Sequence, residues 1–540
     1  MRATMMDYPL TLTHLLDRAG QIFGRVEIVS QTPDKALLRH TYADVRRRAW
    51  ALAEALLAAG LERGDRVATL MWNHHAHLEA YFGVPAAGGV VHTLNLRLHP
   101  DDLTYIANHA EDRFLVVDDV LLPVLEAFAD RVDFERIFVV PHTGQPIPGG
   151  MHSYEALLES ATGDFRHPDI DEDEAAGLCY TSGTTGRPKG VVYSHRALVL
   201  HSFACAMGDM MGALQRDVVL PVVPMFHVNA WGLPYTATLV GCKQVLPGPH
   251  LDPVSLLDLF EREAVTVSGG VPTVWLGILR ELDAAPERWK LAPDLRLLVG
   301  GAAAPESMLR GFDRHGVYVM HLWGMTEMTP LGTASRLKSY MRDLPEAEQR
   351  AYRAKQGLPA PFVEVRAISE QGEAPWDGKT LGELQVRGPW IADGYLKLPE
   401  SDRWTDDGWF CTGDVVSIDA EGYVKIADRT KDLIKSGGEW ISSVELENAL
   451  MGHAAVREAA VIAVPHPRWQ ERPLAVVVRE QGADVGPDEL RAFLEARFAK
   501  WWIPDAFEFV DEIPRTATGK FLKLALRERF AGRGEGGDRT

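Results

Sequence analysis

The run YTSGTTGRPKG, from Tyr180 to Gly190, combines hydroxyl side chains and glycines with two cations at its end. Glycines expose backbone N–H groups, and together with inward-pointing hydroxyls these form a concave nest for phosphate oxygens. Lys189 adds a mobile positive charge to such a nest. The run is not a Walker A loop, because that motif places Ser or Thr after its Gly-Lys pair, whereas Lys189 stands between Pro188 and Gly190. It therefore predicts a phosphate-binding loop of another type.

The segments on either side of this loop support a phosphate site rather than a linker. The apolar run AAGLCY precedes the loop, and RALVLHSFACAM after it has helical character. Strand, glycine-rich loop and helix is the order expected of a phosphate site. A flexible linker of Ser, Gly and Thr is the alternative, but linkers do not usually follow an apolar strand or end in Pro-Lys-Gly.

Six ordered motifs resemble those of the adenylate-forming superfamily, which includes acyl-CoA synthetases, nonribosomal peptide adenylation domains and firefly-type luciferases. The resemblance spans essentially the whole chain. Among the subfamilies, the sequence is most similar to bacterial medium- and long-chain fatty acyl-CoA synthetases, notably through VVPMFHVNAWGLPY at 222–235. After the phosphate loop, the motifs are VGGAAAP (299–305), WGMTE (323–327), TGD (412–414), DRTKDLIKSGGEWIS (428–442) and PRTATGK (514–520).

The resemblance implies an α/β fold with a large N-terminal domain of several subdomains and a small, mobile α+β C-terminal domain. The expected large domain is 1–428, the hinge is 429–431 with Lys431 as the hinge residue, and the small domain is 432–540. The acid would first react with ATP to give acyl-AMP and pyrophosphate. Rotation of the small domain would then let the CoA thiol attack the acyl group. Mg²⁺ is the implied cofactor, ATP and CoA are co-substrates, and a homodimer is expected.

Each motif residue carries an implied role in nucleotide binding. Lys520 would lie between the carboxylate and the α-phosphate and stabilise the transition state, with Glu327 and His227 as further catalytic residues. Thr181 and Glu327 would hold Mg²⁺, since a hard cation takes oxygen ligands. Asp414 would accept from the ribose hydroxyls with help from Arg429. The expected ATP- or AMP-binding residues are Thr181, Ser182, Gly183, Thr184, Thr185, Gly186, Lys189, Gly301, Ala302, Ala303, His321, Leu322, Trp323, Gly324, Thr326, Asp414, Arg429, Lys431 and Lys435.

Two positions indicate the kind of acid. His227 stands where amino-acid-activating relatives have an aspartate for the substrate amine, so an α-amino acid is not expected. Gly324 stands where acetate-activating relatives have a blocking tryptophan, so a deeper pocket is expected. Trp231 could gate a channel for an alkyl tail, although ordinary core packing is the alternative reading of the apolar residues here. The expected acyl and CoA channel comprises Val228, Trp231, Gly232, Met325, Gly437, Gly438 and Trp440, with Met328 as a further apolar wall.

Composition favours a cytoplasmic enzyme without a membrane span. A chain of 540 residues predicts two or more domains. Its 75 acidic and 56 basic residues give a net charge of -19, which repels nucleic acid and anionic membranes, so a phosphate ligand needs a local positive site. No apolar run is long enough to span a bilayer, and no signal peptide is recognised. The four cysteines are far apart and are expected to be reduced and mostly buried.

Hydrophobic periodicity predicts parallel α/β layers in the large domain. A helix is expected near 12–23. A second helix should begin with a capping box, Thr41-x-x-Asp44, and stop at Gly60, with the triplet Arg46 to Arg48 on its solvated face. Strands are expected to begin at Arg66, Phe114, Ile137, Val218, Val265 and Leu295.

Several other functions fit the sequence less well or stay open. The histidines at 74, 75 and 77 lack the H-E-x-x-H spacing of a zinc protease, and no G-x-S-x-G elbow is present. A non-catalytic nucleotide-binding regulator is disfavoured because Lys520, Glu327 and Asp414 are all retained. A firefly-type oxygenase would share every ATP motif. A ligase that loads a carrier protein also stays open, because tethered pantetheine would use most of the CoA tunnel. Trp323 and His321 depart from the tyrosine and carboxamide that are usual in the subfamily.

Overall fold

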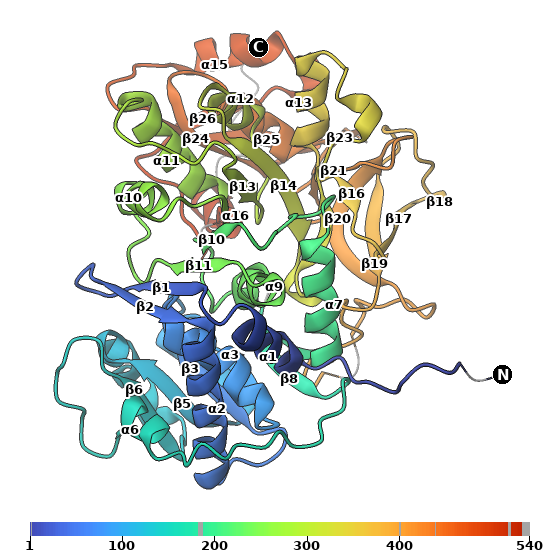
Figure 1. The fold of residues 1–540 in the computed structure, drawn as a ribbon. Helices are drawn as coiled ribbons and strands as arrows, with labels where there is room; N and C mark the ends of the chain where they lie inside the picture. The colour runs from blue at the N-terminus through green and yellow to red at the C-terminus, as the bar shows by residue number, and fades with distance from the viewer. Residues whose placement is uncertain (2, 182–186, 399–400, 438, 517–519, 532–540) are drawn as a thin grey trace.

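The computed structural model describes residues 1, 3–181, 187–398, 401–437, 439–516 and 520–531, and Figure 1 shows their fold. Their strands form four sheets. Two large sheets, which are mostly parallel, occupy the chain as far as residue 359, and two smaller sheets follow. The α/β fold expected from the sequence is confirmed.

The first large sheet has seven strands in the order β7-β6-β5-β3-β4-β8-β9, and only the edge strand β9 is antiparallel to its neighbour. The phosphate loop joins β8 to β9, so a strand separates the loop from the helix that was predicted to follow it. The strands are β3 (Arg66–Leu70), β4 (Val90–Thr93), β5 (Asp112–Asp118), β6 (Arg136–Val140), β7 (His152–Ser153), β8 (Ala175–Tyr180) and β9 (Gly190–Ser194).

Successive residues of the central strand β5 enter different hydrophobic cores. Phe114 and Val116 pack into the core shared with the N-terminal helices. Leu115 and Val117 pack into a separate core on the other face. A parallel sheet is buried on both faces, and this explains why its strands read as continuous apolar runs.

The second large sheet has nine strands in the order β16-β15-β14-β13-β12-β10-β11-β1-β2. Its centre is parallel, whereas β2, β15 and β16 pair antiparallel at the two ends. The strand expected from Val265 begins two residues later. The strands are β1 (Glu27–Gln31), β2 (Leu37–Thr41), β10 (Val218–Pro221), β11 (Lys243–Leu246), β12 (Val267–Gly270), β13 (Arg296–Val299), β14 (Tyr318–Gly324), β15 (Leu331–Ala334) and β16 (Leu358–Pro359).

The two smaller sheets lie on either side of the expected hinge at 429–431. One is fully antiparallel, with order β18-β17-β19-β20-β21. The last sheet, β23-β22-β25-β24 with β26 on β25, has a hydrophobic core of its own, as a separate C-terminal unit requires. The strands are β17 (Glu364–Ser369), β18 (Gly372–Glu373), β19 (Gly382–Arg387), β20 (Phe410–Ile418), β21 (Val424–Arg429), β22 (Ile434–Ser436), β23 (Glu439–Ile441), β24 (Val456–His466), β25 (Gln470–Arg479) and β26 (Ala506–Phe509).

Most helices lie against the large sheets, whereas the helices of the C-terminal unit pack on the last sheet. The predicted start and stop residues of the second helix are confirmed. Thr41 and Asp44 form the expected reciprocal capping box, and Gly60 adopts a left-handed φ of 97° just after the helix ends. The helices are α1 (Leu12–Ile22), α2 (Tyr42–Ala58), α3 (His75–Ala86), α4 (Pro100–Ala110), α5 (Leu122–Glu126), α6 (Tyr154–Glu159), α7 (His195–Ala206), α8 (Val228–Trp231), α9 (Leu233–Val240), α10 (Pro253–Glu263), α11 (Pro272–Ala284), α12 (Glu306–Arg314), α13 (Glu346–Ala354), α14 (Ser443–Leu450), α15 (Pro487–Glu495) and α16 (Lys523–Phe530).

The cysteines are all free thiols, and three of the four are buried, as expected. Among the described residues, we find no helix that combines the length and the apolar character needed to cross a membrane.

The interpretation of Arg46 to Arg48 as a solvated triplet is wrong for Arg48. Its guanidinium lies 2.6 Å from Oε1 of the fully buried Glu79 and 2.7 Å from Glu155, and its side chain is only 18% exposed. Tyr154 donates to the other oxygen of Glu79 at 2.8 Å. Arg47, by contrast, is 70% exposed. The Arg48 side chain points inward because α2 packs against α3, which carries Glu79.

We expect Arg48→Met to lower the free energy of unfolding by about 3 kcal/mol, since it leaves Glu79 buried without its cation. Burial already raises the pKa of Glu79 to about 7, and losing Arg48 raises it further, so the loss should grow as pH rises from 6 to 8. Arg47→Met is the matched control and should change stability by less than about 0.5 kcal/mol. Urea unfolding at both pH values measures the free energy of unfolding of each variant. Equal effects of the two substitutions would contradict the buried ion pair.

Candidate functional site

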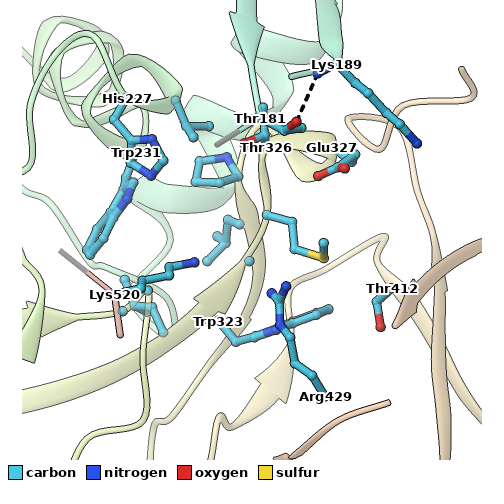
Figure 2. A pocket seen from close by; sticks show the side chains of 18 of the residues that line it. Thr181, Lys189, His227, Trp231, Trp323, Thr326, Glu327, Thr412, Arg429 and Lys520 are labelled. Carbon is cyan, nitrogen blue, oxygen red and sulfur yellow. Dashed lines mark hydrogen bonds between the residues drawn. The ribbon is translucent and has the colours of Figure 1, made fainter. Parts of the chain in front are cut away.

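A pocket of about 260 Å³ opens where parallel strands of both large sheets end. Its walls come from the segments that follow β8, β10 and β13 and from the end of β14, and Figure 2 shows the labelled side chains around it. Ligands of α/β proteins usually bind at the carboxyl ends of parallel strands, because neighbouring loops diverge there and leave a crevice. The position of the pocket is therefore that of a ligand site.

The two ends of the phosphate loop are hydrogen-bonded to each other. Thr181 N donates to the carbonyl oxygen of Lys189 at 2.9 Å, and Lys189 N donates to Thr181 Oγ1 at 3.1 Å. Figure 2 marks the second of these bonds beside Glu327. The predicted loop residues Ser182, Gly183, Thr184, Thr185 and Gly186 lie outside the described residues. The described ends thus bring Thr181 and Lys189 to the pocket wall.

Glu327 is a buried carboxylate held by a residue that the sequence analysis missed. Tyr395 donates from its hydroxyl to Glu327 Oε1 at 2.6 Å, and Ala392 N donates to the Glu327 carbonyl at 2.8 Å. The Lys189 ammonium lies 4.8 Å above the Tyr395 ring. Tyr395 therefore links the candidate metal-binding carboxylate to the cation of the phosphate loop. No local pattern indicates this role, because Tyr395 lies 68 positions from Glu327 in the chain.

Asp414 is buried between two donors. The indole Nε1 of Trp323 donates to Asp414 Oδ2 at 2.9 Å, and Arg429 Nε lies 3.1 Å from Oδ1. The carboxylate raises the pKa of the Arg429 guanidinium, so the guanidinium stays charged at neutral pH. The unusual Trp323 thus has a structural role: its indole N–H orients the Asp414 carboxylate, which is predicted to bind ribose.

Lys520 reaches the pocket from the C-terminal unit. A methyl group placed on Gly301 would lie 3.7 Å from Lys520 Cε, so the lysine stem lies along the glycine loop after β13. Burial and the neighbouring Arg429 charge lower the pKa of Lys520 to about 8. Burial, together with the Lys520 charge, lowers the pKa of His227 to about 3, so His227 is neutral at physiological pH.

The wall beside His227 has a left-handed backbone. Val228, Asn229, Ala230 and Trp231 have φ between 45° and 57°, a region that residues with a Cβ rarely adopt in succession. The indole of Trp231 lies against Gly269 of β12 and against Gly300, which follows β13. A methyl group on these glycines would approach the indole to 3.6 Å and 3.2 Å. Such strain persists only where packing enforces it, and it is concentrated at ligand sites. Here it places a large apolar ring in the pocket wall.

The pocket is positively charged, whereas the protein as a whole has a net negative charge. Five cationic side chains line it, whereas Glu327 is the one carboxylate among the lining residues that the structure describes. Most of these cations contact aromatic rings instead of carboxylates: Arg187 lies 5.0 Å from the Tyr105 ring, and Arg403 lies 5.1 Å from the Phe410 ring. Aromatic faces stabilise a cation without neutralising it. The five cations are Arg187, Lys189, Arg403, Arg429 and Lys520.

The structure brings most of the predicted residues together. The predicted residues that line the pocket are Thr181, Lys189, His227, Val228, Trp231, Gly301, Leu322, Trp323, Gly324, Met325, Thr326, Glu327, Arg429 and Lys520. Lining residues that the sequence analysis did not assign are Arg187, Met211, Gly300, Pro330, Leu331, Tyr395, Arg403 and Thr412. Of these, only Arg187, Gly300 and Thr412 belonged to recognised motifs.

Other predicted residues lie elsewhere. His321 is buried and bonded through Nδ1 to the Ala354 carbonyl at 3.0 Å, outside the pocket lining. Met328 is fully buried in a core cluster with Trp323 and does not form the apolar wall expected of it. Ala302 and Ala303 line a neighbouring cavity that also touches Lys520. Gly232, Asp414, Lys431, Lys435, Gly437 and Trp440 do not line the main pocket, and Gly438 lies outside the described residues.

We expect the Lys520 amine to react with an acylating reagent with a midpoint near pH 8, because only the neutral form is nucleophilic. In an Arg429→Gln variant the midpoint should shift to higher pH. Removal of the neighbouring positive charge stabilises the protonated form of Lys520 and raises its pKa. Pulse labelling across pH, with peptide mass spectrometry, gives the midpoint. An unchanged midpoint in Arg429→Gln would contradict the electrostatic coupling.

Comparison with known proteins identifies the family of this chain. A long-chain-fatty-acid–CoA ligase of Thermus thermophilus is 53% identical over 98% of this chain and 97% of its own, and a 3-methylmercaptopropionyl-CoA ligase of Ruegeria lacuscaerulensis is 47% identical over 98% and 99%. The crystal structure of ATP-bound MatB from Rhodopseudomonas palustris superposes with a TM-score of 0.81 at 29% identity, covering 97% of this chain and 99% of that one. Residues 24–396 match the AMP-binding enzyme family and residues 445–520 match the AMP-binding enzyme C-terminal domain. The chain therefore belongs to the family of AMP-binding enzymes.

Proposed function

We propose that this protein is an AMP-forming ligase that joins a medium- or long-chain fatty acid to CoA. The observation that carries the proposal is the convergence of Lys520 and Glu327 on one cationic pocket that has an apolar wall at Trp231. The 53% identity to a long-chain-fatty-acid–CoA ligase supports the choice of substrate.

In the first half-reaction a carboxylate oxygen attacks the α-phosphorus of ATP. The bond from that phosphorus to the bridging oxygen breaks, and pyrophosphate leaves with the electron pair. Because its pKa is about 8, Lys520 is mainly protonated at pH 7 and can stabilise the negative charge that gathers between the two anions. A fixed cation in a partly buried site does this better than water, since it needs no reorganisation during the reaction.

The side chains near the phosphate loop fit a Mg²⁺ ion. Thr181 supplies a hydroxyl and Glu327 a carboxylate, and hard cations prefer such oxygen ligands. Two protein ligands leave positions for phosphate oxygens and water, which is how Mg²⁺ is usually held beside nucleotides. When bound, the ion would neutralise phosphate charge. The Tyr395 hydroxyl donates to Glu327 and thereby fixes the orientation of this carboxylate.

Asp414 and its donors suit the sugar of the nucleotide. Its carboxylate oxygens are acceptors only, and ribose offers two hydroxyl donors. Trp323 and Arg429 fix the carboxylate on one side, so its remaining lone pairs can face the ligand. Gly301, with a φ of 81°, brings backbone close to the pocket where a side chain would intrude, and this supports the predicted adenine contact.

The opposite end of the pocket suits an uncharged acyl chain. In Figure 2, His227 and Trp231 lie on the side away from Lys189 and Thr412. His227 is neutral, so its ring supplies neither a carboxylate for a substrate amine nor a positive charge for a second substrate carboxylate. Trp231, Met211, Met325 and Leu331 add apolar surface. A short thioether acid is a second candidate, because the 3-methylmercaptopropionyl-CoA ligase is 47% identical to this chain.

The thioester half-reaction requires a second arrangement of the C-terminal unit. Lys435, Gly437 and Trp440 belong to the β22–β23 hairpin and lie outside the pocket, with the Lys435 ammonium 4.5 Å above the Trp440 ring. We propose that rotation at 429–431 withdraws Lys520 and brings this hairpin to the acyl-AMP, with Lys431 as the hinge residue. The exposed position of Lys431 between two sheets is compatible with such a movement.

Pyrophosphate release tests the proposed reaction. With ATP and Mg²⁺, we expect turnover that increases from acetate to medium or long saturated acids and requires CoA. Lys520→Ala should lower adenylation at least 100-fold while ATP still binds, because the lysine acts mainly in the transition state. Including 3-(methylthio)propionate decides between the two candidate acids. Turnover with a pantetheinylated carrier but not with CoA would identify a protein acceptor, and release with none of the acids would contradict the assignment.

Tyr395→Phe tests the positioning of Glu327. Loss of the hydroxyl should weaken binding of Mn²⁺, as a spectroscopic substitute for Mg²⁺, to the ATP complex about tenfold or more, because partners that orient a ligand tune metal affinity. Electron paramagnetic resonance titration gives the affinity. Tyr340→Phe is the matched control, since Tyr340 donates to the exposed Glu421 at 2.6 Å outside the pocket. Equal Mn²⁺ affinities for both variants and the parent would contradict this role.

A further inference from the structure

Arg403 lines the pocket but belongs to none of the recognised motifs. It lies in the segment that leads to β20, and both its backbone carbonyl and its backbone N–H form hydrogen bonds. The Arg403 carbonyl accepts from Cys411 N at 2.7 Å, and Arg403 N donates to Ser401 Oγ at 3.3 Å. The segment that carries the guanidinium is therefore fixed, although the side chain projects into the pocket.

Among the residues that the structure describes, the guanidinium of Arg403 has no acidic partner. Within the described part of the chain, it has no ion pair, and its Nε is shielded from solvent without a hydrogen bond. Two arginines on the adjoining strands differ: Arg366 pairs with Asp407 at 2.8 Å, and Arg387 pairs with Glu364 at 2.7 Å. A guanidinium offers five donors, and shielding its Nε–H from water without an acceptor is costly. An anionic ligand would supply the missing acceptors.

The neighbours of Arg403 place it at the phosphate end of the pocket. A methyl group on Gly413 would lie 3.7 Å from Arg403 Nη1, and the Arg403 charge acts on the Tyr395 hydroxyl. Tyr395 in turn contacts Glu327 and Lys189. Figure 2 shows Glu327, Lys189 and Thr412 on the side opposite to His227 and Trp231. Arg403 therefore lies at the end of the pocket that carries Lys189 and Glu327, away from His227 and Trp231.

We propose that Arg403 binds the β- and γ-phosphates of ATP and holds pyrophosphate after the Pα–O bond breaks. This inference rests on the proposed adenylation reaction. The planar guanidinium can donate two parallel hydrogen bonds to one phosphate, which a lysine cannot do. It thereby supplements the cations and hydroxyls of the phosphate loop. Arg403 contacts the leaving group, whereas Lys520 contacts the α-phosphate and the attacking carboxylate.

Binding of inorganic pyrophosphate and of AMP, each in the presence of Mg²⁺, separates this site from the rest of the pocket. By calorimetric titration, Arg403→Gln should weaken pyrophosphate binding about tenfold or more and change AMP binding less than twofold, because AMP lacks the phosphates concerned. Arg403→Lys should recover only part of the pyrophosphate affinity. The matched control is Arg387→Gln, which removes the same charge outside the pocket and should leave both affinities unchanged.

These measurements use no fatty acid, so they stay informative even if every acid tested is inactive. Equal losses of pyrophosphate and AMP affinity in Arg403→Gln would overturn the proposal, since they would indicate a general disturbance of the pocket. Unchanged pyrophosphate affinity would also overturn it. If an active acid is found, the KM for pyrophosphate in the reverse reaction from acyl-AMP should rise about tenfold in Arg403→Gln, while the KM for CoA stays the same. A selective rise in the KM for CoA would instead place Arg403 at the thiol substrate.

Discussion

The site depends on keeping several cations charged and close together before any anion arrives. Like charges in a partly buried pocket repel one another. The pKa of Lys520 is lowered mainly by burial and further by its repulsion from Arg429. Carboxylate partners would relieve it, but they would also compete with phosphate. Contact with aromatic rings solves this problem for Arg187, Lys189 and Arg403, because a ring face attracts a cation without neutralising it. The pocket thus remains an anion site within a protein of net charge -19.

The two large sheets explain how such a pocket forms from distant segments. Parallel strands send their carboxyl ends to a common edge, so loops separated by many residues meet there. Thr181 follows β8 of one sheet, whereas Gly301 follows β13 of the other. The antiparallel sheet with β20 adds Asp414 and Arg429, and the C-terminal unit adds Lys520. Because the cation nearest the proposed reaction centre comes from a separate unit, the proposed rotation of that unit would withdraw it from the pocket.

Sequence patterns predict residues whose role depends on near neighbours in the chain. They do not predict residues whose role depends on a bond to a distant residue. The capping box of α2 was predictable, because Thr41 and Asp44 are three positions apart and bond locally. Tyr395 was not, since its partner Glu327 is distant in the chain. Met328 was misassigned because an apolar side chain next to a site can face either the pocket or the core. Arg48 was misassigned for a related reason, as periodicity does not reveal a buried acidic partner on another helix.

The sequence by itself determined the α/β class, the order of the motifs and the chemical types of the principal site residues. Local spacing suffices for these features, because turns, caps and glycine-rich loops are specified by near neighbours. The tertiary structure decided which of those residues share one pocket and that Trp323 and Arg429 hold Asp414. It also decided that Arg403 lines this pocket, with no acidic partner among the described residues. Burial and charge at a site are set by groups that converge from distant parts of the chain. The pKa of Lys520 therefore follows from packing and from the position of Arg429 and cannot be read from its motif.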